Sequence, residues 1–211
     1  MLENVIHGLP LQDTVVLTGE GTSNDPIDAH CQELGVKCIR GSEENVFSRF
    51  HLAIQRFEKP LYVRLTGDNP CVYKDILPRM EAKFEDGDLD YLVSTELPLG
   101  GSIEMFTRES FLTQAKNQIS PQQREHVTAE YYKDGSPFRW KKLRAGFSHL
   151  GRLRLTVDSP EDLRMMQILS KKAGSDPCYW DMEMLEKLYR AYPGVFEYNS
   201  KIVQKTVEDL A

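Results

Sequence analysis

Short apolar runs that suit β-strands alternate with amphipathic helical segments along the first half of the chain, and this order constrains the fold most. The strand-like runs are TVVLT (14–18), VKCI (36–39), YVRLT (62–66) and DYLVS (90–94). Asp25 and Pro26 form a helix start after the first run, and apolar residues recur at helical spacing over 46–57 and 76–84. The alternation predicts an α/β fold, with a mainly parallel sheet and helices on both faces.

The pattern changes after about residue 97. SIEMF (102–106) and FRWKKLRA (138–145) are strand-like, and between them helical patterns begin near residue 108 and cover 122–132. RLRLTV (152–157) then returns to the sheet, and an amphipathic helix covers 181–192. No linker-like composition separates these parts. We therefore expect a single domain over residues 1–211, with a small α+β insertion at about 97–150.

Charge and cysteine content exclude several classes of protein. There are 32 acidic and 26 basic residues, for a net charge of -6, so we expect no nucleic-acid partner. No apolar run approaches the roughly 20 residues that cross a bilayer, and the first residues do not resemble a signal peptide, so we expect a cytoplasmic protein without a membrane partner. The four cysteines show no metal-binding spacing and are predicted to be reduced packing residues.

Two stretches of the chain are almost identical: RLTGDNP (64–70) and RLTVDSP (154–160). Each is a strand-like run that ends in an aspartate, Asp68 or Asp158. Ligands of open α/β sheets bind beyond the carboxyl ends of strands, so both carboxylates are predicted to face one crevice. Two carboxylates held together favour a cation, and Mg²⁺ prefers such oxygen ligands together with phosphate. The alternative is that each Asp-x-Pro only begins a helix, with Asp158 or Ser159 as its cap.

Four motifs in order carry a resemblance to a known family. The motifs are VVLTGEGTSNDPIDAHCQELGVKCIRGSEENVFSRF, YVRLTGDNP, REHVT (124–128) and LRLTVDSPEDL. Together they resemble the spore-coat polysaccharide cytidylyltransferase-like family, which is related to the CMP-sialic acid and CMP-Kdo synthetases. The resemblance implies a Rossmann-like, glycosyltransferase-A-like fold. It also implies an enzyme that uses CTP and Mg²⁺. In such an enzyme a hydroxyl of a sugar acid or modified sugar attacks the α-phosphorus, and pyrophosphate leaves.

The resemblance also implies roles for residues of this chain. Asp68 and Asp158 would be the catalytic, metal-holding pair. The nucleotide or the sugar would be bound by Arg40, Ser42, Arg49, Asn69, Glu104, Arg124, Glu125 and His126. The other interpretation of these residues is that they are surface charges and helix caps.

The sequence departs from the family pattern in two places. It contains no Gln-Ala-Arg-x-x-Ser-x-Arg-Leu-Pro-x-Lys loop and no strand before it; the first nine residues instead form an apolar helical stripe. In the family that strand lies between the strands that correspond to 14–18 and 62–66. We expect these two strands to pair directly, the alternative being a segment from a second copy. In PLGGSIEMF (98–106), Leu99 and Ser102 replace acidic residues of the family, whereas Glu104 is retained.

Two functions therefore remain open. One is a cytidylyltransferase that makes a CMP-sugar for surface polysaccharide synthesis. The other is a catalytically inactive, truncated homologue that acts as a binding or assembly subunit. We also expect a homodimer, because the inserted segment of the relatives tends to form a dimer contact. Aromatic side chains that could fill that contact, or pack in the core instead, are Phe106, Phe111, Tyr131, Tyr132 and Trp140.

Overall fold

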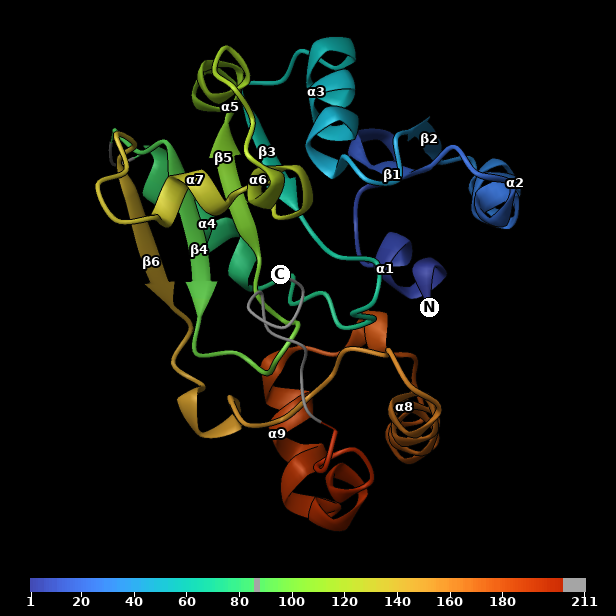
Figure 1. Ribbon diagram of the computed structural model, residues 1–211. Helices are drawn as coiled ribbons and strands as arrows, with labels where there is room; N and C mark the ends of the chain where they lie inside the picture. Colours follow the sequence, from blue (N-terminus) through green and yellow to red (C-terminus); the bar gives the residue numbers. More distant parts are fainter. Residues whose placement is uncertain (86–87, 203–211) are drawn as a thin grey trace.

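The computed structural model describes residues 1–85 and 88–202, and its strands form two separate sheets (Figure 1). In the first, β1 (Val15–Gly19) and β2 (Lys37–Gly41) pair in parallel. The second has the order β3–β5–β4–β6, with bounds β3 (Leu61–Arg64), β5 (Glu104–Thr107), β4 (Tyr91–Thr95) and β6 (Trp140–Arg144). β3, β4 and β6 share one direction, and β5 runs antiparallel between β3 and β4. The α/β fold is confirmed.

Helices occupy the segments between the strands. Their bounds are α1 (Leu2–His7), α2 (Asp25–Glu33), α3 (Val46–Arg56), α4 (Ile76–Glu85), α5 (Arg108–Ala115), α6 (Pro121–Glu125), α7 (Ala129–Tyr132), α8 (Pro160–Ala173) and α9 (Met182–Ala191). Local sequence explains the ends of the long ones. Asn45 caps α3 by accepting a hydrogen bond from the Ser48 amide, and α8 ends at Gly174, whose φ of 66° suits glycine.

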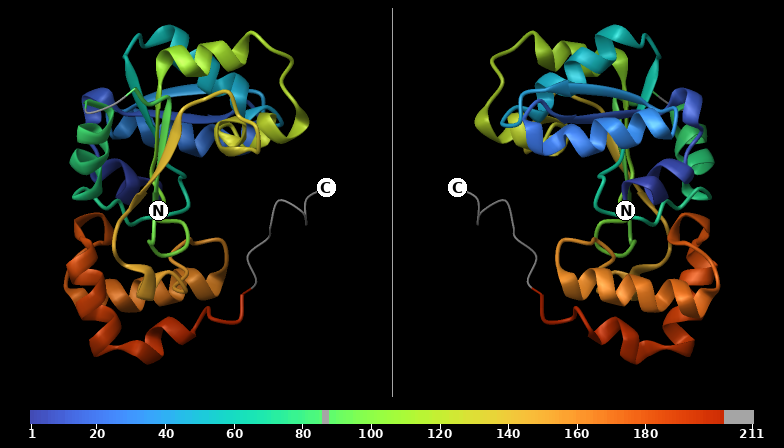
Figure 2. Two further views of the ribbon diagram at one scale, coloured as in Figure 1. Left: turned by 90° about the vertical axis from the view of Figure 1, so that its left-hand side faces the viewer. Right: turned by 90° about the vertical axis from the view of Figure 1, so that its right-hand side faces the viewer.

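Two apolar cores lie on opposite faces of the second sheet, because successive strand residues point to opposite sides. Leu92 and Met105 belong to the core that includes side chains of α4, α8 and α9. Their neighbours Tyr91 and Phe106 belong to the core that includes side chains of α3, α5 and α7. Figure 2 shows α8 and α9 as a layer at one end of the molecule, beyond the carboxyl ends of β4 and β6.

Two helix and strand predictions in the second half need correction. The helix expected over 122–132 is split into α6 and α7, because His126, with φ -100° and ψ 54°, ends α6, and Val127 and Thr128 are buried between the two helices. The expected strand at 152–157 is reduced to one parallel bridge between Leu99 and Arg154. Three of the aromatic residues expected at a dimer contact, Phe106, Phe111 and Tyr131, are fully buried in the core instead.

The prediction that the strands at 14–18 and 62–66 pair directly is wrong. Within residues 1–85 and 88–202, β1 pairs only with β2 and β3 only with β5. Helix α3 explains why the two sheets stay apart. It packs on β1 and β2, while its residues Phe47 and Ile54 belong to the core that covers β4 and β5. One edge of β1 and one edge of β3 therefore have no strand partner in the described chain.

Other expectations about the chain can be compared directly with the structure. The four cysteines are free, as predicted, and three of them are buried. Among the described residues, no helix combines the length and the apolar character needed to cross a membrane.

Candidate active site

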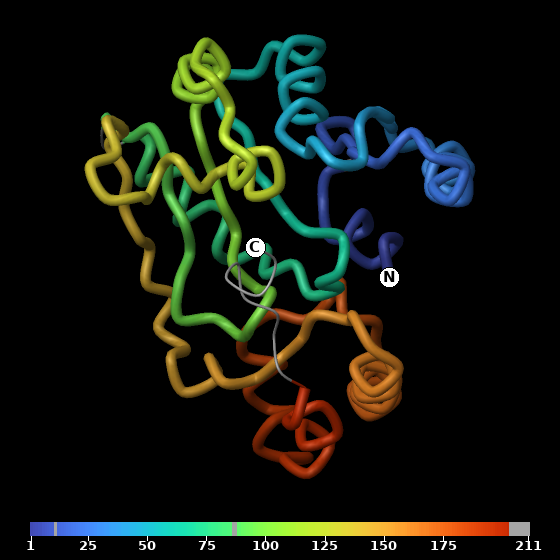
Figure 3. The backbone as a smooth tube through the Cα atoms, viewed as in Figure 1, coloured from blue at the N-terminus to red at the C-terminus, as the bar shows by residue number. Residues whose placement is uncertain are grey.

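Asp68 lies in the turn after β3, and Figure 3 shows the chain after β3 running close to the chain that leads into α8. The Val157 amide donates a hydrogen bond of 2.9 Å to the Asp68 carbonyl, so the backbones before Asp158 and at Asp68 are in contact. The carboxylate of Asp68, unlike its carbonyl, has an oxygen that accepts no hydrogen bond in the described chain. Its Oδ1 atom is buried and has no hydrogen-bond partner among the described residues. A buried carboxylate oxygen without a donor is costly unless a cation or a ligand completes it.

Asp158 is held by a buried arginine. Arg154, only 8% exposed, donates from Nη2 to Asp158 Oδ2 at 2.5 Å and from Nε to Asp162 Oδ1 at 3.1 Å. Asp162 is fully buried and also accepts hydrogen bonds from Asn199 and from the backbone amides of Asp158 and Ser159. Burial alone would raise the pKa of Asp162, but these hydrogen bonds outweigh it and hold the pKa below its ordinary value.

The helix-start alternative is realised by Ser159, not by Asp158. Ser159 accepts a hydrogen bond from the Asp162 amide and forms a capping box with Asp162, while Pro160 occupies the first turn of α8. The Asp158 side chain remains 45% exposed and is therefore available to a ligand. Two carboxylates on contacting backbone segments, one with an oxygen that has no partner among the described residues, have the chemistry that suits a Mg²⁺ ion, which takes its other ligands from water and phosphate.

Glu104 is the centre of a buried hydrogen-bond network on the second sheet. Arg64 on β3 lies directly opposite it and forms an ion pair with its Oε2 atom. The hydroxyls of Tyr91 and Thr128 both donate to Oε1 at 2.6 Å. Burial and the Glu104 charge raise the pKa of Tyr91, so its hydroxyl stays a donor. All the donors come from β3, β4 and the α6–α7 connection, so the network fixes Arg64.

The REHVT motif joins this network by a residue that the sequence did not single out. Arg124 and Glu125 are exposed at the end of α6, and His126 is partly buried where that helix ends. Thr128, two residues later, is buried and reaches Glu104. The structure therefore brings Glu104 and this motif together, but through Thr128.

Arg40 and Ser42 have structural contacts. Arg40 donates to the carbonyls of Gly19, at the end of β1, and of Glu20 and Gly21, just after it, and forms an ion pair with Asp25 at 2.7 Å. Ser42 accepts a hydrogen bond from the Asn45 amide just before α3. These contacts agree with the cap and surface-charge interpretation of both residues.

Arg49 differs from them. Its Nε atom is buried without a hydrogen-bond partner among the described residues, and burial lowers its pKa. It lies against Gly41 at the end of β2, where a Cβ on that glycine would be 3.0 Å from the Arg49 side chain. An unsatisfied buried guanidinium nitrogen indicates a position that can receive an acceptor.

Asn69 fixes the loop that carries Asp68. Its amide nitrogen donates to the Gly100 carbonyl at 2.6 Å, and its oxygen accepts from the Cys71 amide at 3.1 Å. Gly100 has a φ of 87°, and a Cβ there would be 2.3 Å from Thr156. Only glycine fits between these segments, so Gly100 of PLGGSIEMF forms part of the packing beside the Asp68 loop.

Sequence reasoning missed two arginines that the structure places in the site. Arg64 and Arg154 each lie four residues before the aspartate in the repeated R-L-T-x-D stretch. Their common position was visible in the sequence. What it did not reveal is that Arg154 binds Asp158, whereas Arg64 binds Glu104.

Comparisons with known proteins identify a family and two relatives. The family described as "Cytidylyltransferase" matches residues 1–204. The spore coat polysaccharide biosynthesis protein SpsF of Bacillus subtilis is 32% identical over 179 residues, which cover 83% of this chain and 74% of that protein. An uncharacterized protein of Methanocaldococcus jannaschii is 29% identical over 212 residues, covering 100% of this chain and 86% of that protein.

Solved structures show the same fold at low sequence identity. A cytidylyltransferase from Leptospira borgpetersenii superposes with a TM-score of 0.83 at 22% identity, over 98% of this chain and 86% of that one. A CMP:2-keto-3-deoxy-manno-octonic acid synthetase complexed with CTP superposes with a TM-score of 0.56 at 14% identity, over 81% of this chain and 87% of that one.

Proposed function

The chain belongs to the cytidylyltransferase family, and we propose that it transfers the CMP group of CTP to a sugar acid or modified sugar, with release of pyrophosphate. The name of its Bacillus subtilis relative supports a role in surface polysaccharide synthesis. One observation carries the proposal. Asp68 and Asp158 occupy contacting backbone segments, and one buried Asp68 oxygen has no partner within residues 1–85 and 88–202.

We assign the two aspartates to a Mg²⁺ ion, for which their oxygen ligands and the unpartnered Oδ1 atom are suited. When bound, the ion would neutralise charge on the phosphates during nucleotidyl transfer. Arg154 fixes the Asp158 carboxylate and offsets part of the charge of Asp158 and Asp162. It thereby lowers the cost of keeping several carboxylates close together before ligand binds.

Two arginines are the candidates for binding the anionic substrates. Arg64 stands four residues before Asp68 and is fixed by Glu104, so Glu104 acts as a positioning residue for it. The Nε atom of Arg49 has no hydrogen-bond partner in the part of the chain that the structure describes. A guanidinium held in one orientation can bind phosphate or carboxylate oxygens through two parallel hydrogen bonds. For Arg124, Glu125 and His126, contact with the sugar or nucleotide remains a proposal.

Titration calorimetry with CTP and Mg²⁺, followed by a pyrophosphate-release assay with a panel of sugar acids, tests this function. We expect CTP binding that depends on Mg²⁺ and is lost in Asp68→Asn and Asp158→Asn. The exposed Asp134 provides a matched control, because Asp134→Asn should leave binding unchanged. Binding that persists in both site variants would overturn the assignment of the two aspartates.

The second candidate function is a catalytically inactive subunit that binds or assembles with another chain. It is favoured by the edges of β1 and β3 that have no strand partner among the described residues, since unpaired strand edges are templates for added strands. The same calorimetry distinguishes the two: a folded chain that binds no CTP with or without Mg²⁺ supports the second. A homodimer is proposed with either function, with the exposed Tyr132 and partly buried Trp140 as the aromatic residues left for an interface.

A further inference from the structure

The segment that follows α9 reaches the candidate active site through one buried side chain, Asn199. This residue comes just after the short helical turn Pro193–Glu197 and is 2% exposed. Its side-chain amide donates to the Arg154 carbonyl at 3.0 Å and to Asp162 Oδ1 at 2.8 Å. Both of these residues in turn form hydrogen bonds with Asp158, so Asn199 contacts the groups that support this carboxylate.

The contacts of Asn199 fix the arginine that binds Asp158. Asp162 Oδ1 accepts a hydrogen bond from Arg154 Nε as well as from Asn199. Arg154 Nη2 then donates to Asp158 Oδ2 at 2.5 Å. The guanidinium group is planar, so an acceptor that fixes Nε also fixes the direction in which Nη2 points. Asn199 therefore helps to set the orientation of the Asp158 carboxylate.

The backbone of Arg154 is held from two sides. The Leu99 carbonyl accepts from the Leu155 amide at 3.2 Å, and the Leu99 amide donates to the Leu153 carbonyl at 2.8 Å. In an extended segment, the carbonyl of the residue between these two points to the opposite side. That carbonyl belongs to Arg154 and accepts from Asn199. Leu99 thus holds one edge of the segment that leads to Asp158, and Asn199 holds the other.

Packing places Asn199 where it can make these contacts. Phe196 is 6% exposed and packs edge-on against Tyr189 of α9. The guanidinium group of Arg164 on α8 lies 5.5 Å from the centroid of the Tyr198 ring. A side chain whose surroundings are already ordered can position another group at little further entropic cost.

Asn199 carries no charge, and this distinguishes its contribution from that of Arg154. Loss of Arg154 would remove a positive charge beside Asp158, and that change alone favours a bound cation. Loss of the Asn199 amide leaves the charge of the site unchanged. We propose that Asn199 is a positioning residue that acts through Arg154 and Asp162 to orient the carboxylate of Asp158. This role rests on the proposed function, because it requires that Asp158 binds a divalent ion.

Mn²⁺ binding to the full chain, measured by electron paramagnetic resonance, tests this role, since Mn²⁺ prefers the same oxygen ligands as Mg²⁺. Each protein is measured well below its own melting temperature. We expect Asn199→Ala to raise the dissociation constant for Mn²⁺ at least fivefold. Asn199→Ser should raise it as well, because one hydroxyl can donate to only one of the two acceptors. Wild-type affinity in Asn199→Ala, or in Asn199→Ser if the alanine variant does not fold, would overturn the role.

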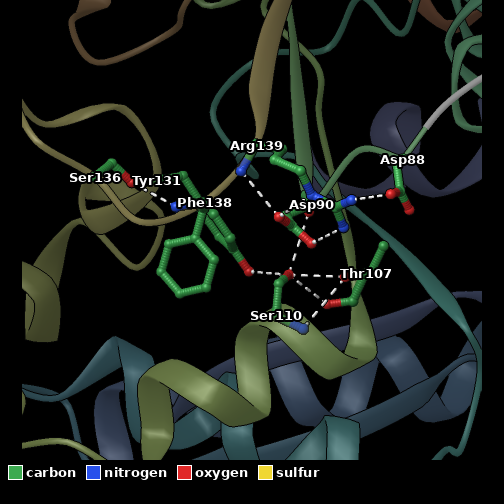
Figure 4. Close-up of polar contacts among 8 residues, drawn as sticks. All are labelled: Asp88, Asp90, Thr107, Ser110, Tyr131, Ser136, Phe138 and Arg139. Atoms are coloured by element: carbon green, nitrogen blue, oxygen red, sulfur yellow. Dashed lines mark hydrogen bonds and ion pairs between the residues drawn. The ribbon is translucent and has the colours of Figure 1, made fainter.

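Two controls separate positioning from a loss of stability. Ser110 is 4% exposed and belongs to a hydrogen-bond network around Asp90, which directly precedes β4 (Figure 4). A strand of this length places the network about 15 Å from the carboxyl end of β4, so Ser110→Ala removes buried hydrogen bonds away from the site. Phe196→Leu loosens the segment that carries Asn199 but removes no hydrogen bond. Both controls should lower the melting temperature and keep the Mn²⁺ dissociation constant within twofold of wild type. A loss of affinity in either control that matches the loss in Asn199→Ala would overturn the role.

Wild type and Asp158→Asn distinguish a failure of this role from a failure of the proposed function. Absence of Mn²⁺ binding by wild type, or equal binding by Asp158→Asn, would overturn the metal site and the role of Asn199 with it. Binding that is lost in Asp158→Asn but kept in Asn199→Ala would overturn the role of Asn199 alone.

Discussion

Replacement of Asp162 by asparagine should destabilise the protein strongly, although the residue is outside the proposed contact with substrate. Asp162 is fully buried, and its two oxygens accept from Arg154 Nε and Nη2, Asn199 Nδ2 and the amides of Asp158 and Ser159. An asparagine keeps one acceptor oxygen but turns an NH₂ group toward donors. It also removes the negative charge beside the buried Arg154.

The expected size of the effect follows from these contacts. Removal of one partner of a buried, hydrogen-bonded ion pair costs about 3–5 kcal/mol, because the other charge is left uncompensated. A domain has only about 5–15 kcal/mol of unfolding free energy, so Asp162→Asn should lose a large part of it. Loss of the Ser159 cap alone, in Ser159→Ala, should cost about 1 kcal/mol. The capping contact therefore cannot explain a loss of the expected size.

Urea denaturation followed by circular dichroism measures the two variants against wild type. The surface variant Asp134→Asn is the matched control and should unfold like wild type. A loss below about 1 kcal/mol in Asp162→Asn would refute the reasoning, because it would mean that Arg154 is adequately compensated by Asp158 and solvent.

The same carboxylate predicts a pH dependence of stability. The pKa of Asp162 is held below its ordinary value of 3.8 in the folded state. Its contribution to the unfolding free energy is therefore fully present above that value and is lost as pH falls through the depressed pKa. Wild type should lose stability on acidification more steeply than Asp162→Asn. Parallel curves for the two proteins below pH 4 would contradict this linkage.

Three further predictions concern ligand, network and assembly. Mg²⁺ at about ten times its dissociation constant should stabilise wild type by about 1.4 kcal/mol, or about 3–6 °C in melting temperature, and both Asp68→Asn and Asp158→Asn should lose this shift; an unchanged shift in both would refute the shared ion. Glu104→Gln should lower the unfolding free energy, measured by urea denaturation, by about 1.5–3 kcal/mol, because it removes a charged acceptor from Arg64; an unchanged unfolding free energy would mean that the ion pair contributes nothing. Light scattering at micromolar concentration should give a dimer, and a monomeric mass would count against the proposed interface.

The sequence predicted secondary structure well where one segment carried its own signal. Strands β1 to β4 coincide with apolar runs, and α8 begins at a capping box, so local sequence determines these elements. The segment 122–132 was harder. Its helical periodicity was real, but burial of Val127 and Thr128 against the sheet required a break between α6 and α7. Tertiary contacts overrode the local pattern there.

The placement of the sheets could not be derived from the local pattern. Direct pairing of β1 and β3 was expected because unpaired backbone groups are costly when buried. That cost applies only if the edges are dry, however. β1 has a half-buried start, and Val63 on β3 is 40% exposed, so solvent can reach both strands. Helix α3 lies against β1 and β2 while its residues Phe47 and Ile54 pack into the core on the second sheet, so this helix links the two sheets without strand pairing.

The repeated R-L-T-x-D stretch shows how similar local sequences acquire different chemistry through their neighbours. In the first copy, Glu104 on the adjacent strand binds Arg64, and one Asp68 oxygen is left without a partner among the residues that the structure describes. In the second copy, Asp162 one turn into α8 binds Arg154, which also reaches Asp158. One aspartate is thus left short of positive charge and the other is partly neutralised. A divalent ion between them would supply the missing partner of the Asp68 oxygen. When no ion is bound, Arg154 would limit the repulsion between the two carboxylates, because it partly neutralises Asp158.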